Sequence, residues 1–397
     1  MSPTQLSATG LPAPEAEAAV APSRLYFLDW LRIAAFAALV LYHVGMYYVR
    51  WDFHVKSPLA AQVGPWLEPW MKLTEPWRMS LIFMVSGAAT ALMLQSGPTV
   101  ALLRQRSRFL LLPLLAGIVL VVPPQSYFEV LHKYGYSGDY FSFLGLYFSH
   151  YGGFCHGAKC LILPTWNHLW FLPYLWIYTG VLWLALRLWP KLLKTLAGLA
   201  ANLLKGPGLF LLPIASLLAL RLGLAERFPQ NYSVVGDWFS HARYFSAFLT
   251  GAVFASLPVM WTRLANARWL ALVVAVLGWA AMVGVWASRA LQPVLIAILV
   301  WCALVAAFGF AKTRLDFDHP WRLRLVEAVF PVYVLHQTLI ILASQVLLPL
   351  QWPAALEATA IIAATFALSY AGYLLVSRWA ILRPWFGLRP QQPGAAI

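Results

Sequence analysis

The sequence predicts an all-α membrane protein, a polytopic bundle of about ten transmembrane helices with both termini in the cytoplasm. Of its 397 residues, 61% are hydrophobic and only 11% are charged. A soluble domain carries about a quarter charged residues, so this composition excludes an ordinary soluble protein. Apolar runs near 20 residues, long enough to cross a bilayer, recur along the chain.

Ten such runs can be distinguished, and the prolines that interrupt some of them are tolerated where neighbouring helices satisfy the backbone. They lie approximately at residues 26–49, 75–95, 107–125, 166–188, 206–224, 241–260, 268–287, 293–311, 326–350 and 355–377. No internal repeat is evident. Residues 24–380 are therefore predicted to form one transmembrane domain.

Lysine and arginine set the predicted orientation, because cytoplasmic loops of membrane proteins carry an excess of both. With the N-terminus inside, the inner loops and tails hold 17 Lys and Arg residues and the outer segments hold 10. This count places both termini in the cytoplasm of a multi-pass protein, which we expect in the bacterial inner (plasma) membrane. The net charge of +14 would suggest nucleic acid in a soluble protein, but here the distribution of the charges matters more than their sum. The partner is the lipid bilayer, and no nucleic acid is expected.

The two terminal segments are predicted to be tails. Residues 1–23 are rich in Ala and Pro and contain no Lys or Arg, so they lack the basic region of a signal peptide. We interpret them as a disordered cytoplasmic tail, and residues 381–397 as a cytoplasmic C-terminal tail.

The first span carries three ionisable residues, Asp29, Arg32 and His43, within its apolar run. Such groups cost free energy in a membrane and usually face the protein interior, where they mark function. On a helix, Arg32 and His43 lie ~20° apart around the axis and ~16 Å apart along it, and Asp29 lies ~40° from His43. The three residues therefore form one polar stripe along the helix. The alternative is a structural polar pair between helices, but His43 could also act as a general base because a histidine pKa is near neutrality.

An arginine-rich run, RQRSR, precedes the third span and contains Arg104, Arg106 and Arg108. Guanidinium groups bind phosphate bidentately, so the run suits a cytosolic ligand with nucleotide-like phosphates. Ordinary anchoring by positive charge at the inner membrane surface is an equal alternative.

The segment PWRMSLIFMVSG, residues 76–87, opens the second span. Ser86 and Gly87 would let another helix approach closely. Arg78 is a charge beside aromatic residues at the outer mouth of the bundle, which favours contact with a substrate there.

Three further residues are candidates for the outer, substrate-binding side. Glu129 follows Pro123-Pro124, which should end the third span, and it could orient an imidazole or bind a sugar hydroxyl. A solvated loop acid is the alternative. His168 stands at a helix entrance, and His336 lies inside an apolar span, where a histidine either packs or belongs to a site.

Cys155 and Cys160 occur in CHGAKC, within the longest polar loop. In an oxidising compartment they could form a disulfide. A zinc site would need four ligands, more than this run offers, so no metal is predicted. No Walker loop, GxGxxG, GxSxG or HExxH motif stands in a supporting context, which argues against an ATP-driven pump and familiar hydrolases.

Several of these segments resemble one family in the same order. LDWLRIAAFAALVLYH, with its Arg-x10-His pattern, is similar to the opening helix of the acyltransferase 3 family of membrane acyltransferases. IFMVSG, the arginine-rich run, NHLWFL and VYVLHQ resemble later landmarks, and the similarity spans roughly residues 24–380. Within the family, WDFHVKSP followed by WRMSLIFMVSG looks like the glucan succinyltransferase branch.

The resemblance implies a core of ten helices that transfers an acyl group from cytosolic acyl-CoA to a hydroxyl presented outside. It implies that His43 is catalytic and that Arg32 is essential. The acceptor would be an extracytoplasmic glycan or a similar molecule, and the acyl group of the acetyl or succinyl class.

Combined with the stripe geometry, this gives one hypothesis. Arg104, Arg106 and Arg108 would hold the CoA phosphates, and a channel past Arg32 would lead the thioester to His43. Asp29 would hold Arg32. His43 would deprotonate the acceptor or form an acyl-His intermediate. The competing hypothesis is a lipid or glycan transporter, although the paired broken helices of transporter repeats are not evident. Whether the protein forms a homo-oligomer stays open.

Overall fold

A computed structural model describes residues 25–157, 159–284 and 288–390. The tail predicted for residues 1–23 and the last seven residues lie outside this description. The helices are α1 Tyr26–Tyr48, α2 Ala60–Leu94, α3 Val100–Ala116, α4 Pro123–Tyr134, α5 Tyr140–Phe148, α6 Phe171–Leu188, α7 Leu192–Leu203, α8 Gly208–Leu224, α9 Trp238–Ala255, α10 Pro258–Val283, α11 Gln292–Arg314, α12 Pro320–Leu347 and α13 Ala354–Arg378. Short segments add a π-turn (Gly117–Val121), 3-10 turns (Asn167–Trp170, Leu348–Leu350, Arg383–Phe386) and a hairpin of β1 Cys155–His156 and β2 Lys159–Cys160.

The all-α polytopic architecture is confirmed. Within the described residues, 7 helices are long and apolar enough to cross a membrane, and the number rises to 9 if each of two bent helix pairs is one span. The bent pairs are α3 with α4, at 45°, and α7 with α8, at 113°. Helix α9 matches the sixth predicted run, at 241–260, but is not among these nine.

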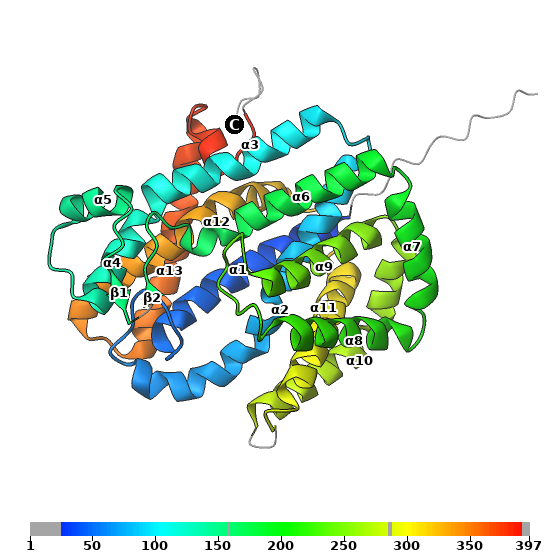
Figure 1. The fold of residues 1–397 in the computed structure, drawn as a ribbon, viewed down its shortest axis with the longest axis horizontal. Helices are drawn as coiled ribbons and strands as arrows, with labels where there is room; N and C mark the ends of the chain where they lie inside the picture. The colour runs from blue at the N-terminus through cyan, green and yellow to red at the C-terminus, as the bar shows by residue number, and fades with distance from the viewer. Residues whose placement is uncertain (1–24, 158, 285–287, 391–397) are drawn as a thin grey trace, which may run out of the picture.

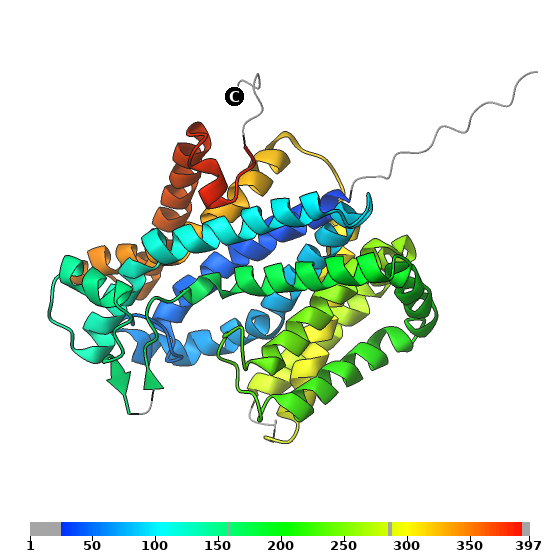
Figure 2. The ribbon, with the colours of Figure 1, turned by 45° about the horizontal axis from the view of Figure 1, so that its top comes forward.

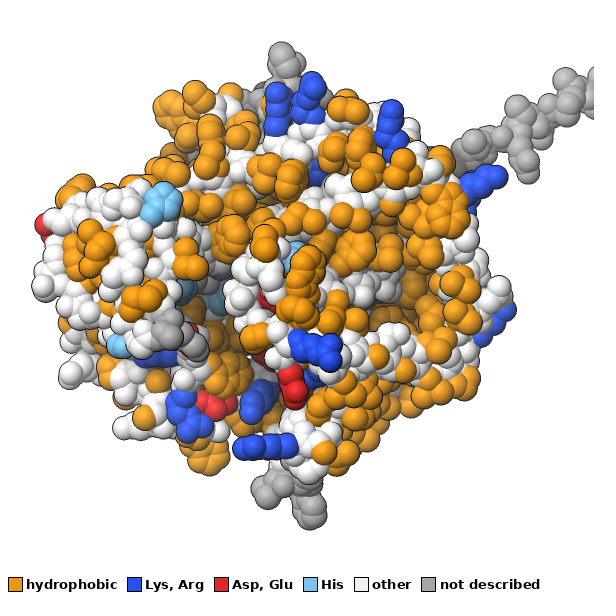
Figure 3. Space-filling model, viewed as in Figure 1, with side chains coloured by type: hydrophobic (Ala, Val, Ile, Leu, Met, Phe, Trp, Pro, Cys, Tyr) orange, Lys and Arg blue, Asp and Glu red, His pale blue; other side chains and the backbone are white. Residues whose placement is uncertain are grey.

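The long helices pack side by side through the centre of the molecule, while α4, α5 and the β1–β2 hairpin gather at one end (Figures 1 and 2). Helices α10 and α11 form an antiparallel pair on the opposite flank from α13 (Figure 2). Hydrophobic side chains cover most of the face in Figure 3, and Lys and Arg side chains gather mainly near its edges and lower centre. This distribution suits a protein surrounded by lipid tails.

Proline fixes the start of α4. The α3 segment ends in a π-turn, in which the backbone N–H of Val122 donates to the carbonyl of Gly117 over 2.8 Å. Pro123, which has no N–H to continue the helix, then begins α4. Helix α4 ends at Gly135, whose φ of 66° is readily adopted by glycine. The chain bends by 45° at the predicted end of the third span, Pro123-Pro124, and Glu129 lies on a helix rather than in a solvated loop.

Helices α2 and α9 cross at two glycines. A Cβ atom at Gly87 would lie 1.8 Å from the carbonyl oxygen of Phe248, and one at Gly251 would lie 1.8 Å from that of Met84. The predicted close approach at Gly87 is therefore confirmed. Small residues play this role in membrane bundles because lipid tails offer no hydrophobic driving force for helix association.

The packed region extends past residue 380. Arg383 donates to Glu327 of α12 over 2.8 Å, and Leu388 is buried against the same part of the molecule. Residues 383–388 therefore pack on the bundle instead of leaving it as a tail.

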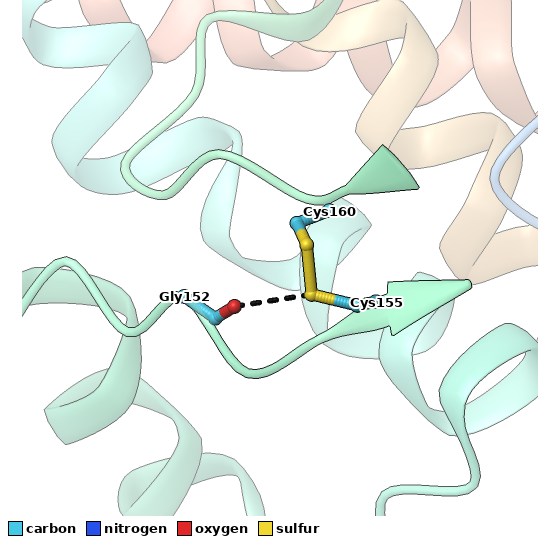
Figure 4. The surroundings of a disulfide bond; sticks show 3 residues. All are labelled: Gly152, Cys155 and Cys160. Atoms are coloured by element: carbon cyan, nitrogen blue, oxygen red, sulfur yellow. Dashed lines mark hydrogen bonds between the residues drawn. A yellow bond between two sulfur atoms is a disulfide. The ribbon is translucent and has the colours of Figure 1, made fainter. Parts of the chain in front are cut away.

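Cys155 and Cys160 form a disulfide that closes the β1–β2 hairpin (Figure 4). The Sγ atom of Cys155 lies 3.2 Å from the carbonyl oxygen of Gly152. His156 donates through Nε2 to the carbonyl of Lys133 over 2.5 Å, which fastens the hairpin to α4. Of the two alternatives for this run, the structure contains the disulfide.

The glycine crossing can be tested by Gly87→Ala. The added methyl would meet backbone rather than a movable side chain, and such overpacking lowers the free energy of unfolding by about 1–3 kcal/mol. Thermal unfolding in detergent should report the loss. Gly223→Ala in α8, where no atom lies within 4 Å, is the control and should be neutral or stabilising. Equal melting temperatures for the two variants would contradict the close approach.

Candidate active site

A chain of hydrogen bonds joins α1 to α12 through two histidines. His43 Nδ1 lies 2.8 Å from His336 Nε2, and His336 Nδ1 lies 2.6 Å from the carbonyl oxygen of Tyr333. A carbonyl only accepts, so His336 carries its proton on Nδ1 and, when neutral, accepts through Nε2. His43 must then donate from Nδ1. Its Nε2 keeps a free lone pair, on a side chain that is only partly buried.

The two helices that carry this pair run parallel and meet again at their other ends. Asp29 of α1 forms an ion pair with Arg322 of α12, whose side chain is 1% exposed. Arg322 also bonds to Asp318 over 2.8 Å. From Asp29 to His43 and from Arg322 to His336 the chain advances by the same 14 residues. The predicted contact of Asp29 with Arg32 is thus replaced by a pairing between helices, although Asp29 still attracts Arg32 electrostatically.

Behind the pair lies a third histidine with a fixed tautomer. His168 Nε2 donates to the carbonyl of Val334 over 3.0 Å, and the His168 and His336 rings meet edge to face at 5.0 Å. Gln125 of α4 lies 3.4 Å from His168 Nδ1 and donates to Thr338 over 2.7 Å. This buried network holds α4 and α12 around His336, which is fully buried. His168 therefore supports the site from behind.

The turn Asn167–Trp170 brings His168 inward. Asn167 adopts a φ of 41°, which asparagine tolerates better than most residues, and it donates to Gln125 over 3.1 Å. Gln337 donates to the same Gln125 oxygen over 3.0 Å.

A fourth histidine, His54, comes from the loop after α1. Its Nδ1 donates to Glu129 over 2.5 Å, and Lys133 donates to Glu129 over 2.9 Å. Glu129 is only 7% exposed, so it is paired rather than solvated. Glu129 thus contacts an imidazole, as one of the roles considered for it requires. His54 Nε2 makes no hydrogen bond within the described residues.

The same loop is fastened to the end of α1. Lys56 donates to the carbonyls of Met46 and Val49 over 2.8 and 2.9 Å, and Ser57 donates its backbone N–H to Tyr47. Cations favour the carbonyl end of a helix. Burial lowers the pKa of Lys56 to about 8, so most molecules keep this charge at neutral pH.

Arg78 of α2 supplies an unpaired cation beside the histidines. Its guanidinium lies 3.5 Å from the centre of the Tyr42 ring, and that ring lies 5.7 Å from the ring of His43. Arg78 is 5% exposed, yet its Nε and Nη1 groups have no hydrogen-bond partner. Buried N–H groups of a cation without acceptors are costly, so this site favours an oxygen ligand.

A separate cavity of about 50 Å³ lies further along α1. Arg32 of α1 and Arg106 of α3 line it, together with Phe36, Phe109 and Phe330. Arg106 Nε is buried and lacks a hydrogen-bond partner, and neither arginine joins the ion pairs found among the described residues. Two cations facing one small cavity make it a candidate site for an anionic group.

The structure places the three arginines of the predicted phosphate site in different surroundings. Arg104 and Arg108 are exposed, and only Arg106 reaches the cavity. The run lies within α3, where residues two apart point ~200° apart around the axis and residues four apart share a face.

Aromatic rings separate this cavity from the histidines. Phe36, which lines the cavity, packs 5.3 Å from the ring of Tyr333, and Tyr333 donates its hydroxyl to the carbonyl of His168 over 2.7 Å. The predicted channel from Arg32 to His43 would have to pass Phe36 and Tyr333, which pack together at this point.

A family model, the acyltransferase domain Acyl_transf_3, matches residues 25–374. The chain belongs to this acyltransferase family. No curated protein and no solved structure matches the chain. The match covers α1 to α12 and α13 as far as Leu374, and so includes all the residues of the histidine cluster. The protein is a membrane acyltransferase.

Sequence patterns identified five residues that lie in or beside the acyltransferase's histidine cluster, but not how they pair. They are His43, His336, His168, Arg78 and Glu129. His54 was missed as a site residue. The feature that marks His54 is its hydrogen bond to Glu129, a residue 75 positions away, and the sequence alone does not indicate that contact.

The ion pair at the far end of α1 can be measured by a double-mutant cycle of Asp29→Asn and Arg322→Gln. Each single change should lower the free energy of unfolding by about 1–3 kcal/mol, less than for a fully buried pair because Asp29 is partly exposed. The double change should cost less than the sum, with a coupling of roughly 0.5–3 kcal/mol. Arg324→Gln, an exposed neighbour, is the control. Strict additivity would contradict the pairing.

Proposed function

We propose that this acyltransferase moves an acetyl- or succinyl-class acyl group from cytosolic acyl-CoA to a hydroxyl of an extracytoplasmic glycan or similar acceptor. The observation that carries the proposal is the free lone pair on His43 Nε2, left by the hydrogen-bond chain to His336 and Tyr333. An imidazole in this state is a base at neutral pH. The similarity to the glucan succinyltransferase branch supports a glycan acceptor.

The transfer can then be written with His43 as a general base. Its Nε2 takes the proton of the acceptor hydroxyl while the oxygen attacks the thioester carbonyl. The carbon–sulfur bond breaks, and the imidazolium returns the proton to the departing CoA thiolate. The bond from Nδ1 to His336 keeps the ring oriented and stabilises the imidazolium. In the alternative route, Nε2 attacks the thioester and an acyl-His forms first.

Arg78 would stabilise charge in the transition state. The attack places a negative charge on the thioester oxygen, and donors that are already in position lower the barrier most effectively. The unpaired N–H groups of Arg78, held on the Tyr42 ring beside His43, suit this task.

His54 would hold the acceptor. Its Nε2 is free to bind a hydroxyl, while Glu129 and Lys133 fix the ring from the other side. The ring of Phe53 lies between the two histidines: its centre is 6.3 Å from that of His43 and 5.3 Å from that of His54.

Arg32 and Arg106 would hold a phosphate of the donor. Their cavity has room for a few water-sized groups, so it suits one phosphate and not a whole CoA molecule. Under the predicted orientation it lies on the cytoplasmic half of the membrane. The rings of Phe36 and Tyr333 must then shift for the pantetheine arm to reach His43.

The base is tested with purified protein, labelled acyl-CoA and a glycan acceptor. His43→Ala should reduce transfer by roughly 10²–10⁴-fold, the usual contribution of a general base. His336→Phe removes the acceptor for Nδ1 and should reduce transfer by a smaller factor. His336→Gln, whose amide oxygen can accept the bond, should retain more activity than His336→Phe. Full activity of His43→Ala would refute the assignment.

The donor site is tested by Arg106→Gln, with Arg104→Gln as the matched control on the same helix. Loss of a charge-assisted contact to phosphate should weaken CoA binding by about tenfold or more. The effect should be larger at low salt, because screening weakens such contacts. Calorimetry on the detergent-solubilised protein can measure both variants. If Arg104→Gln weakens binding as much as Arg106→Gln, the cavity is not the phosphate site.

The acceptor role is tested by His54→Asn and Glu129→Gln. Both should raise the KM for the acceptor and leave the KM for acyl-CoA unchanged, because neither residue lies near the arginine cavity. His132→Asn, an exposed histidine on the same helix as Glu129, is the control. An equal rise in both KM values would point to a general loss of structure instead.

A further inference from the structure

A cavity of about 390 Å³ lies away from the histidine cluster. It is lined by residues of α2, α7, α8, α9 and α11. Helix α2 separates it from the proposed active site, since Ser80, which lines the cavity, points ~200° around the helix from Arg78. Apart from a few hydroxyl groups and one arginine, the lining is apolar.

The arginine stands at one end of this cavity. Arg243 of α9 lines this cavity. It also lines an adjoining space of about 20 Å³, which Arg221 of α8 lines as well. The two spaces share Leu217, Leu220 and Val300 as walls. Arg243 is 8% exposed, its guanidinium donates to the carbonyl of Pro76, and the two arginines repel each other.

No ion pair of the described residues neutralises either arginine. The exposed Glu75 attracts Arg221 from a greater distance. Neither cation has a carboxylate within ion-pair distance among the described residues, and Glu75 also attracts Arg78, which leaves an excess of positive charge where charge is costly. A bound anion would remove this cost.

Ser80 adds a hydroxyl at the same level. Its side chain is 1% exposed, lines the cavity and has no hydrogen-bond partner. Because Pro76 of α2 meets Arg243, Ser80 lies only ~6 Å further along the helix. The hydroxyls of Ser216, Ser246 and Thr250 are instead bonded to carbonyls of their own helices.

The depth of these groups suits a lipid. Under the predicted orientation, α8 ends and α9 begins on the outer side, so Arg221 and Arg243 lie ~5 and ~8 Å inside the helix ends. The apolar part then follows α9 from Arg243 to Phe254 for ~16 Å toward the inner side. The cavity thus has a cationic end near the outer surface and an apolar body along the membrane normal.

We propose that this cavity binds an anionic phospholipid of the outer leaflet. The phosphate would lie between Arg221, Arg243 and Ser80, and one acyl chain would fill the space between α8, α9 and α11. Helix α8 has Leu209 as its buried residue, so an inserted chain would supply packing that protein side chains do not provide there. This site does not depend on the proposed acyl transfer.

Native mass spectrometry of the purified full chain can count bound lipids after titration with phosphatidylglycerol or phosphatidylcholine. We expect one phosphatidylglycerol to remain bound at a concentration where phosphatidylcholine does not. Arg221→Gln should weaken this adduct by about tenfold, the loss expected for a charge-assisted contact. Arg227→Gln, exposed and outside the cavity, is the matched control and should bind as the unaltered chain does.

A second pair of variants tests the chain-binding part. Ser216→Trp places a bulky ring in the cavity from an exposed position of α8, whereas Ala215→Trp places it beside the cavity. Only the first should abolish the adduct. Circular dichroism of all four variants checks that each one is folded.

Three results would overturn the proposal. Equal retention of phosphatidylcholine and phosphatidylglycerol would show that charge plays no part. An unchanged adduct in both Arg221→Gln and Ser216→Trp would place the lipid elsewhere. If inorganic phosphate alone raises the melting temperature as much as phosphatidylglycerol and displaces it, the site binds free anions and not lipid.

Discussion

A polar side chain inside a membrane is costly unless another group satisfies it, and the arrangement around His43 follows from this constraint. Each histidine of the cluster makes a bond that fixes its tautomer or its orientation, to His336, to a carbonyl or to Glu129. These bonds also bring together α1, α4, α12 and the turn before α6. The pairing that makes the polar groups tolerable in lipid is thus the same pairing that prepares one nitrogen for chemistry.

Two arginines near the proposed site depart from this rule. Arg78 has unpaired N–H groups beside His43, and Arg106 has an unpaired Nε at the cavity that it shares with Arg32. A folded protein keeps such groups where a ligand completes them more often than where nothing does. Arg78 lies beside His43, whereas Arg106 lines one cavity with Arg32, so the two arginines lie near opposite halves of α1.

Local features of the fold were predictable from the sequence, and pairings between distant segments were not. Apolar length locates the spans, Pro123 marks the start of α4, and Gly87 indicates the close crossing with α9. The partner of Asp29 was predicted as Arg32, one turn away, but it is Arg322, because helices bring residues 293 positions apart into contact. Helical periodicity alone could have separated Arg106 from its two exposed neighbours.

The equal spacing of the two contacts between α1 and α12 has a mechanical consequence. An α-helix is stiff along its axis, so α1 behaves over the ~21 Å between Asp29 and His43 as a short rod. Any axial displacement of α1 against α12 that stretched the Asp29–Arg322 contact would stretch the His43–His336 bond by the same amount. The hydrogen bond that orients the His43 ring at one end of α1 is therefore mechanically coupled to the Asp29–Arg322 contact at the other end.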